Sequence, residues 1–277
     1  MEVIFLKKKI KLKYKNIIII FIYIICFIML FISIFNIIKW KIDANNNDNQ
    51  IDGINEKVEI EEINEGEIIN QNIDISKSNP YWDYIKMNLI NVNFNDLKII
   101  NNQTKGWIQV NGTNINYPFV QTKDNTYYLN HSFNKSYNDA GWLFVDYRNK
   151  LDETDKNIII YAHARLDKSM FGSLKNILKS DWLKNTNNYV VKLSTEYENT
   201  LWQVFSIYNI PTTSDYIQTE FNNISNYQKF LDMLLKRSNY NFNTSINEND
   251  NILTLSTCYN KSDKVVLHAK LIKRVKR

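Results

Sequence analysis

A cysteine and a histidine each follow a short apolar run in this chain, where nucleophilic chemistry is feasible. Cys258 ends the run that begins at residue 252, and His163 follows the run 158–161. Catalytic groups are often displayed where a buried strand opens into a loop. A free thiol has a pKa near about 8.5, so a nucleophilic cysteine needs a neighbouring imidazolium or other cation. The pattern leaves two interpretations open: a thiol nucleophile with an acid–base partner, or an inert buried cysteine.

The other cysteine and the other histidines favour simpler roles. Cys26 lies inside a long apolar run far from Cys258, so the two are not expected to form a disulfide. His131 falls in a predicted loop and His268 in a predicted strand, where surface and packing roles are expected. One thiol with scattered histidines lacks the ligand spacing of a metal site, so no metal ion or other cofactor is predicted.

Composition and charge exclude several classes of protein. The chain has 277 residues with 44% hydrophobic and 23% charged residues, as ordinary globular or membrane-tethered proteins have. Two cysteines and six glycines exclude a disulfide scaffold and a collagen-like repeat. Six lysines and Glu2 among the first 15 residues together give the whole net charge of +5, which leaves the remainder neutral. Nucleic acid is therefore not an expected partner.

Residues 17–38 predict a membrane span. This run has no charged residue, and at about 1.5 Å per residue it reaches roughly 33 Å, enough for a hydrocarbon core of about 30 Å. The preceding lysines place the N-terminus in the cytoplasm and the bulk of the chain outside. A cleaved signal peptide is the alternative, but the run is too long and no small-x-small cleavage site follows it. We expect residues 1–16 to be a basic cytoplasmic tail and residues 17–38 to be a transmembrane anchor in a lipid bilayer.

The rest of the chain divides into a polar stalk, residues 39–79, and a folded domain, residues 80–277. The stalk is rich in Asn, Glu, Asp and Ile and poor in aromatic residues. Helical patterns begin near Tyr81 and Asn95 and cover 169–183 and 226–237. Eight strand-like runs separated by turn residues predict a mostly β domain, a barrel or a sandwich, with peripheral helices. The runs are 107–110, 115–120, 141–147, 158–161, 189–193, 201–208, 252–256 and 265–272.

Several of these segments resemble class B sortases. Residues 254–258 resemble the T-L-x-T-C signature, and residues 161–163 with 169–174 resemble the histidine segment of that class. The resemblance covers roughly residues 80–273 and implies an eight-stranded β-barrel with N-terminal helices. It also implies a membrane-anchored cysteine transpeptidase of a Gram-positive cell envelope. Further matching blocks, in the order of the family, are 106–108, 117–120, 124–129 and 140–149.

The resemblance also implies roles for individual residues. Cys258 would attack a threonine carbonyl in a sorting motif similar to N-P-x-T-x and form a thioester with the secreted protein. His163 would protonate the leaving amine and later deprotonate an incoming amine of peptidoglycan or its precursor. Sorting-motif peptides and that amine are thus the expected partners. The residues that match the substrate groove of the family are Asn125, Leu129, Thr212, Tyr216, Ile217 and Ser256.

One departure from the family pattern concerns the cation near the nucleophile. Sortases carry an arginine at the start of the last strand, where this chain has Lys264. Lysine keeps the positive charge but lacks the planar fork that binds two acceptors. Arg165, two residues after His163, is either a compensating cation or an exposed loop residue. Asp146 and Arg148 are expected to be structural hydrogen-bonding partners.

Two alternative functions follow from the same residues. Lys264 in place of arginine is compatible with a catalytically weakened or silent protein that binds sorting peptides without forming a thioester. A membrane-tethered thiol hydrolase would release the acyl group to water instead of an amine. The sequence does not separate hydrolase from transferase.

Overall fold

The structure of the chain is a computed structural model that describes residues 14–69, 80–258 and 262–277, with Cys258 described by its backbone. Residues 1–13 of the predicted basic tail and residues 70–79 of the predicted stalk lie outside the described residues. The chain forms two compact units, Met1–Asn45 and Asn46–Arg277.

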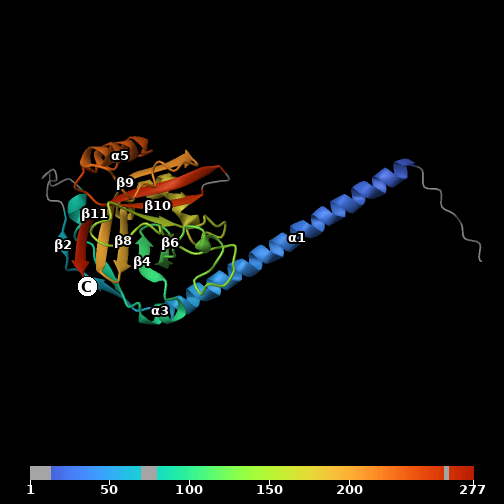
Figure 1. The fold of residues 1–277 in the computed structure, drawn as a ribbon, viewed down its shortest axis with the longest axis horizontal. Coiled ribbons are helices and arrows are strands. Elements are labelled where there is room, and N and C mark those ends of the chain that lie inside the picture. The colour runs from blue at the N-terminus through green and yellow to red at the C-terminus, as the bar shows by residue number, and fades with distance from the viewer. Residues whose placement is uncertain (1–13, 70–79, 259–261) are drawn as a thin grey trace, which may run out of the picture. The chain divides into compact units, whose positions relative to one another are not determined.

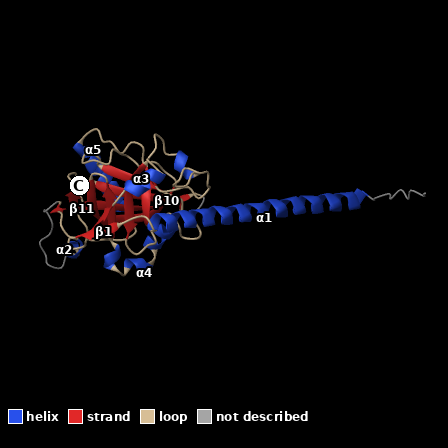
Figure 2. Ribbon diagram, turned by 90° about the horizontal axis from the view of Figure 1, so that it is seen from below, coloured by secondary structure: helices blue, strands red, loops and turns tan. Residues whose placement is uncertain are grey.

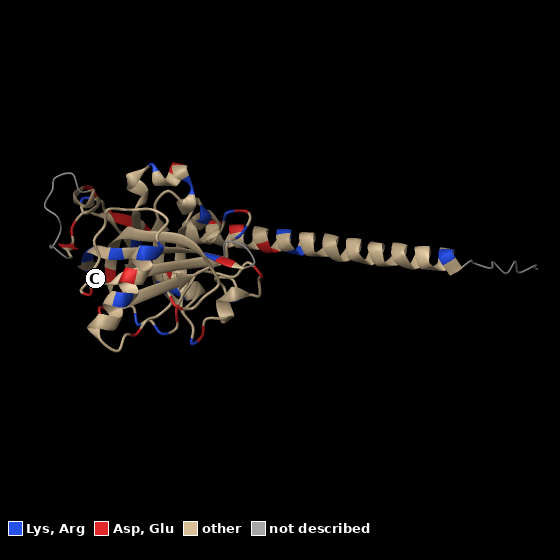
Figure 3. Ribbon diagram, turned by 90° about the horizontal axis from the view of Figure 1, so that it is seen from above, with Lys and Arg blue, Asp and Glu red and all other residues tan. Residues whose placement is uncertain are grey.

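Helix α1 (Tyr14–Asn55) contains the predicted membrane span. It has 42 residues and is long and apolar enough to cross a membrane. Figure 3 shows no Lys, Arg, Asp or Glu along the middle of this helix. Cys26 lies in this part as an exposed free thiol. The helix continues beyond residue 38, so the first part of the predicted stalk is helical.

Eight strands form a closed ring, which confirms the predicted β-barrel (Figure 1). In the described part of the chain the ring order is β10-β7-β6-β5-β4-β8-β9-β11, and pairing of β10 with β11 closes it. Each predicted strand-like run supplies one strand of the ring. The strands are β4 (Thr104–Val110), β5 (Asn116–Val120), β6 (Phe144–Val145), β7 (Asn157–Tyr161), β8 (Val190–Thr195), β9 (Glu198–Pro211), β10 (Ile252–Cys258) and β11 (Asp263–Lys276).

Two layers of apolar side chains hold the ring. The interior of the barrel is filled by buried apolar side chains, among them Ile108, Phe119 and Leu255. Helix α5 (Ile224–Arg237) covers β9, β10 and β11 on the outside and buries an apolar face that includes Leu231 and Leu234. Because β10 is buried on both faces, its sequence is a nearly continuous apolar and β-branched run rather than an alternating one. Figure 2 shows the helices around the strands of the barrel.

The remaining elements are short and surround the barrel. Two of the helices, α2 and α3, lie where the sequence predicts helical patterns near Tyr81 and Asn95. The predicted helix 169–183 is a 3₁₀ helix followed by one α-helical turn, and the predicted helix 226–237 is α5. The bounds are α2 (Tyr81–Tyr84), β3 (Leu89–Val92), α3 (Asn95–Ile100), η1 (Tyr127–Leu129), η2 (Gly172–Leu178), α4 (Ser180–Leu183) and η3 (Thr186–Asn188).

Part of the predicted stalk belongs to the folded domain. Strand β1 (Ile60–Ile63) pairs antiparallel with β3, and β2 (Glu67–Ile68) pairs with the end of β11. Ile54, near the end of α1, is buried in the core of the barrel unit. The sequence predicts only a polar stalk here, because strands of two and four residues are too short to show a period of two. Ile60, Ile63 and Ile69 nevertheless pack against the core, whereas Ile68 is exposed.

A buried hydrogen-bond chain joins β7, β9, β10 and β11. Thr254 Oγ1 donates its one proton to Asn157 Oδ1 at 2.7 Å. Its second contact, with His268 Nδ1 at 2.9 Å, is therefore one that it accepts, and Nδ1 carries the proton. His268 Nε2 then accepts from the hydroxyl of Tyr208 at 2.7 Å. Burial, followed by the charge of Arg237, lowers the pKa of His268 to about 3. His268 therefore has the predicted packing role and is neutral in the folded protein.

This burial makes the free energy of unfolding depend on pH. An unfolded histidine titrates near about 6.5, whereas folded His268 stays neutral down to about pH 3, so the unfolded state binds more protons between these values. The contribution of His268 is complete above pH 6.5 and is lost as the pH falls. As the pH falls through this window, we expect the free energy of unfolding to decrease by about 1.4 kcal/mol per pH unit because of His268. Urea titrations of the full chain in detergent, followed by tryptophan fluorescence, measure this slope.

The variant His268→Gln should be less stable at neutral pH. Its free energy of unfolding should also depend less on pH between about 3 and 6.5. Phe205 packs beside the His268 ring at a centroid distance of 5.9 Å, so Phe205→Leu is a matched control. It should destabilise the protein at every pH and keep the slope of the wild type. Equal slopes for the wild type and His268→Gln would contradict the assignment.

Candidate active site

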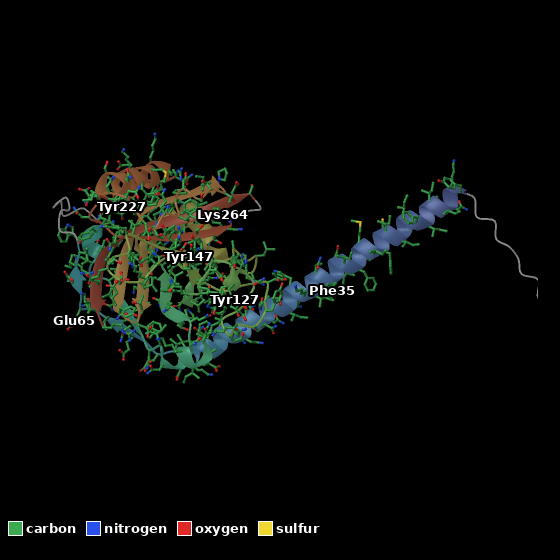
Figure 4. The ribbon with its side chains drawn as sticks, in the orientation of Figure 1. Phe35, Glu65, Tyr127, Tyr147, Tyr227 and Lys264 are labelled. Atoms are coloured by element: carbon green, nitrogen blue, oxygen red, sulfur yellow. The ribbon has the colours of Figure 1, made fainter. Side chains whose placement is uncertain are left out.

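A groove of about 710 Å³ lies where β7 and β10 end and β11 begins. Its lining residues come from these strand ends, from η1 and the loop before it, and from the connection that follows β9. Figure 4 shows Lys264 near the start of β11. The lining residues are Asn125, Leu129, Phe144, Tyr161, Ala162, His163, Thr212, Thr213, Ser214, Tyr216, Ile217, Ser256, Thr257 and Lys264.

The parallel pairing of β7 and β10 brings the predicted cysteine and histidine positions to the same edge of the barrel. Tyr161 of β7 is aligned with Ser256 of β10. His163 follows Tyr161 by two residues, just as Cys258 follows Ser256. Thr257 Oγ1 donates to the Ala162 carbonyl at 2.7 Å, which extends the contact beyond the last strand pair. The backbones at His163 and Cys258 therefore continue two adjacent segments at the same edge of the barrel.

Lys264 stands on the other side of Cys258. In the antiparallel pair of β10 and β11, Lys264 is the residue directly opposite Cys258, and it also lines the groove. The backbone of Cys258 is thus flanked by the segment that carries His163 and by the strand that carries Lys264. The resemblance to the family predicted a cation at this position, the start of the last strand. The strand register explains why a cation at this position is next to the cysteine.

A backbone carbonyl fixes the orientation of His163. His163 Nε2 lies 2.7 Å from the carbonyl oxygen of Leu129. A carbonyl only accepts, so Nε2 carries a proton. Gly141, with φ of +62°, lies against this arrangement. A Cβ at Gly141 would be 2.5 Å from the carbonyl oxygen of Tyr128 and 3.1 Å from His163 Cδ2, so only glycine leaves room for this approach.

The residues predicted for the substrate groove lie together. All six of them line the groove that contains His163 and Lys264. Tyr216, buried beneath the groove, forms a hydrogen bond of 2.9 Å between its hydroxyl and Ser256 Oγ. This bond joins the connection after β9 to the strand that ends in Cys258. The six residues are Asn125, Leu129, Thr212, Tyr216, Ile217 and Ser256.

Arg165 is a buried residue, which corrects the exposed loop arginine offered by the sequence as one interpretation. Its side chain is 9% exposed, so it is not an exposed loop arginine. Its Nε and Nη2 atoms each lie 3.0 Å from Asp167 Oδ2. Asp167 is held in turn by the backbone N–H and hydroxyl of Ser169. Arg165 is not among the described residues that line the groove.

Six lining residues were not predicted from the sequence: Phe144, Tyr161, Ala162, Thr213, Ser214 and Thr257. Ala162 and Thr257 directly precede His163 and Cys258, so their place at the strand ends was a usable signal. Phe144 lies in a strand of two residues, too short for alternation to reveal its direction. Among the described residues no three His, Cys, Asp or Glu side chains are close enough to hold a metal ion.

Known proteins resemble this chain in sequence and in structure. The Sortase domain family matches residues 108–272. Sortase B of Staphylococcus aureus is 37% identical over 184 residues, which cover 65% of this chain and 75% of that protein. Sortase B of Listeria monocytogenes is 37% identical over 183 residues, which cover 64% of this chain and 73% of that protein.

Solved structures agree with these sequence matches. A Staphylococcus aureus sortase B–substrate complex has 36% identity and a TM-score of 0.61, over 65% of this chain and 84% of that one. Sortase B from Bacillus anthracis in complex with AAEK1 has 32% identity and a TM-score of 0.66, over 84% of this chain and 99% of that one. With the closed eight-stranded barrel, these matches show that the chain belongs to the sortase family of cysteine transpeptidases and is similar to its class B members.

Proposed function

We propose that this sortase cleaves a sorting motif resembling N-P-x-T-x on secreted proteins and transfers them to an amine of peptidoglycan or its precursor. The observation that supports this proposal most directly is the strand register around Cys258. It places the backbone of Cys258 between the segments that carry His163 and Lys264, at the edge of one groove. The similar Staphylococcus aureus sortase B has been solved with its substrate, which supports a substrate-binding role for this groove.

The walls of the groove suit a short extended peptide. Leu129 and Ile217 offer apolar surface, whereas Asn125, Thr212 and Ser256 offer polar groups. Binding sites for small ligands typically combine a mostly apolar lining with a few polar groups that fix orientation. A peptide that contains proline and threonine presents both kinds of surface. The proposal therefore assigns these residues to substrate binding.

The first half of the proposed reaction forms a thioester. The thiolate of Cys258 attacks the carbonyl carbon of the threonine in the sorting motif, and the C–S bond forms as the peptide C–N bond breaks. The ammonium group of Lys264 stabilises the negative charge on the carbonyl oxygen. His163 acts as the general acid and gives its proton to the leaving amine. Because Nε2 is engaged with Leu129, Nδ1 is the atom that exchanges this proton.

The second half reverses these steps with a different amine. The amine of the cell-wall acceptor attacks the thioester carbonyl, so a new C–N bond forms and the C–S bond breaks. His163, now neutral at Nδ1, takes the proton from the incoming amine. The thiolate of Cys258 and the protonated histidine are restored. The secreted protein ends in an amide bond to the acceptor.

We also propose that the chain is anchored by residues 17–38, with residues 1–16 in the cytoplasm and the barrel outside. The length and apolar character of α1 support the anchor. The lysines that precede it support the orientation, because positive residues favour the cytoplasmic side. Such a tether would keep the groove near secreted proteins and cell-wall precursors at the outer surface of the membrane.

A second candidate function rests on Lys264. A lysine makes one directed contact where the planar fork of arginine makes two, so the oxyanion would be held less firmly. A chain that binds sorting peptides but does not turn them over would be a peptide-binding protein of the cell surface. Binding without formation of a thioester would support this alternative.

The variant Cys258→Ala is expected to abolish ligation because it removes the nucleophile. Full-length protein in detergent is incubated with N-P-x-T-x peptides and triglycine, and the ligated product and the thioester adduct are measured by mass spectrometry. Cys26→Ala, which removes the thiol in α1, is the matched control and should keep full activity. Ligation that persists in Cys258→Ala would refute the proposed mechanism. A hydrolysed peptide with no ligated product in the wild type would indicate a hydrolase.

The variant Lys264→Ala should reduce the rate of ligation about 10²–10³-fold, as expected for loss of one oxyanion donor. Lys264→Arg restores charge and adds a second donor, so it should match or exceed the wild-type rate. Arg165→Ala is the control because it removes a cation outside the groove, and it should lower thermal stability more than the rate. Rates are measured in single-turnover assays of thioester formation. A large loss of rate in Arg165→Ala with none in Lys264→Ala would reverse the assignment of the cation.

A further inference from the structure

The buried carboxylate of Asp146 contacts several segments that line the groove. Its side chain is fully buried just after β6. Oδ1 accepts from Arg148 Nε at 2.8 Å and from the Arg148 backbone N–H at 3.0 Å. Oδ2 accepts from Arg148 Nη2 at 2.7 Å, from Asn125 Nδ2 at 2.9 Å and from the Tyr161 hydroxyl at 2.9 Å. Both carboxylate oxygens are therefore engaged by several donors.

These partners connect the two walls of the groove. Asn125 lies in the loop before η1, and Tyr161 ends β7 two residues before His163. Arg148 Nη2 also donates to the carbonyl oxygen of Ile217, at 2.9 Å, in the connection that follows β9. Asn125, Tyr161 and Ile217 all line the groove. One ion pair thus holds three lining residues that are far apart in the sequence.

The contacts fix the direction of the Asn125 amide. Asn125 Oδ1 accepts from the backbone N–H of Tyr147 at 3.0 Å, and Nδ2 donates to Asp146. A rotation of this amide by 180° would set its oxygen against a carboxylate oxygen and its NH₂ group against an N–H donor. The amide is therefore locked, with a known donor end and a known acceptor end.

The charges of the cluster are consistent with this arrangement. Burial alone would raise the pKa of Asp146, but hydrogen bonds from Arg148 and Tyr161 and the charge of Arg148 hold it below its usual range. Burial, together with the charge of Asp146, raises the pKa of Tyr161. At neutral pH the carboxylate is thus ionised, and the tyrosine keeps the proton that it donates.

We propose that Asp146 is a positioning residue for peptide binding, which acts through Arg148, Asn125 and Tyr161 to hold the two walls of the groove in one arrangement. This inference rests on the proposed function, because it takes the groove to be the site of the sorting peptide. Asp146 contacts wall residues and none of the groups proposed to react. Its loss should therefore weaken peptide binding more than it slows bond cleavage.

The variant Asp146→Asn tests this role. It keeps the shape of the side chain but replaces one carboxylate oxygen with an NH₂ group. The donors that bind that oxygen would then face another donor, so their hydrogen bonds are lost. We expect KM for an N-P-x-T-x peptide to rise about tenfold while kcat changes less than about threefold. Arg148→Lys, which keeps the charge but loses the fork that reaches Ile217, should raise KM as well. Since Arg148 is 34% exposed, this second variant remains informative if Asp146→Asn does not fold.

A matched control separates positioning from stability. Asp250, which precedes β10, is 2% exposed and accepts from the backbone N–H of Asn247 at 2.8 Å. Asp250→Asn removes a buried charge away from the groove and should lower thermal stability without changing KM. An increase of KM in Asp250→Asn equal to that in Asp146→Asn would assign the effect to general destabilisation and would overturn the proposal.

A double-mutant cycle tests whether Asp146 acts through Asn125. If it does, Asp146→Asn combined with Asn125→Ala should raise KM little more than the more severe single change. Peptide affinity in the Cys258→Ala background tests the same role without turnover, and Kd should rise about tenfold in Asp146→Asn. An unchanged Kd there would overturn the positioning role, whereas an inactive wild type that retains this Kd pattern would overturn only the proposed catalysis.

Discussion

The pairing of β10 with two neighbours is the constraint on which the rest of the structure depends. Strand β10 is parallel to β7 and antiparallel to β11, and its pairing with β11 closes the barrel. The same pairings set the positions of His163, Cys258 and Lys264 along the edge of the groove. A slip of one residue in either register would turn each side chain of β10 to the opposite face. Closure of the barrel and assembly of the site are therefore one event.

The two faces of β10 stabilise this register in different ways. The interior face packs in the apolar core, where Leu255 is fully buried. On the face towards α5, the hydrogen-bond chain through Thr254 and His268 joins β10 to β7, β9 and β11. Each member of this chain has a defined donor and acceptor role, and a shifted register would leave buried polar atoms without partners. Polar bonds thus specify the alignment that apolar packing stabilises.

The groove itself depends on contacts outside the strand ladders. The Leu129 carbonyl orients His163, and Tyr216 joins the connection after β9 to Ser256. Asp146 performs the same task for the opposite wall, as an ionised group in the interior that is satisfied by several donors. A buried charge of this kind requires nearly all of its partners at once. The loops that form the groove are therefore held by a few specific bonds to a rigid barrel, which keeps the binding surface ordered.

The sequence alone determined the eight strands, because strand propensity and apolar runs are local properties. The roles of Cys258 and His163 follow from the resemblance to the family and stay a prediction. The sequence also predicted that Lys264 stands at the position of the family arginine, since this required only counting along one strand. The burial of Arg165 against Asp167, the short strands in the predicted stalk and the role of Phe144 in the groove came only from the tertiary structure. Each depends on partners that are distant in sequence or on segments too short to show a period. The clearest case is the set of hydrogen bonds that Asp146 and Arg148 form with Asn125, Tyr161 and Ile217. Only the closed barrel brings those three segments together.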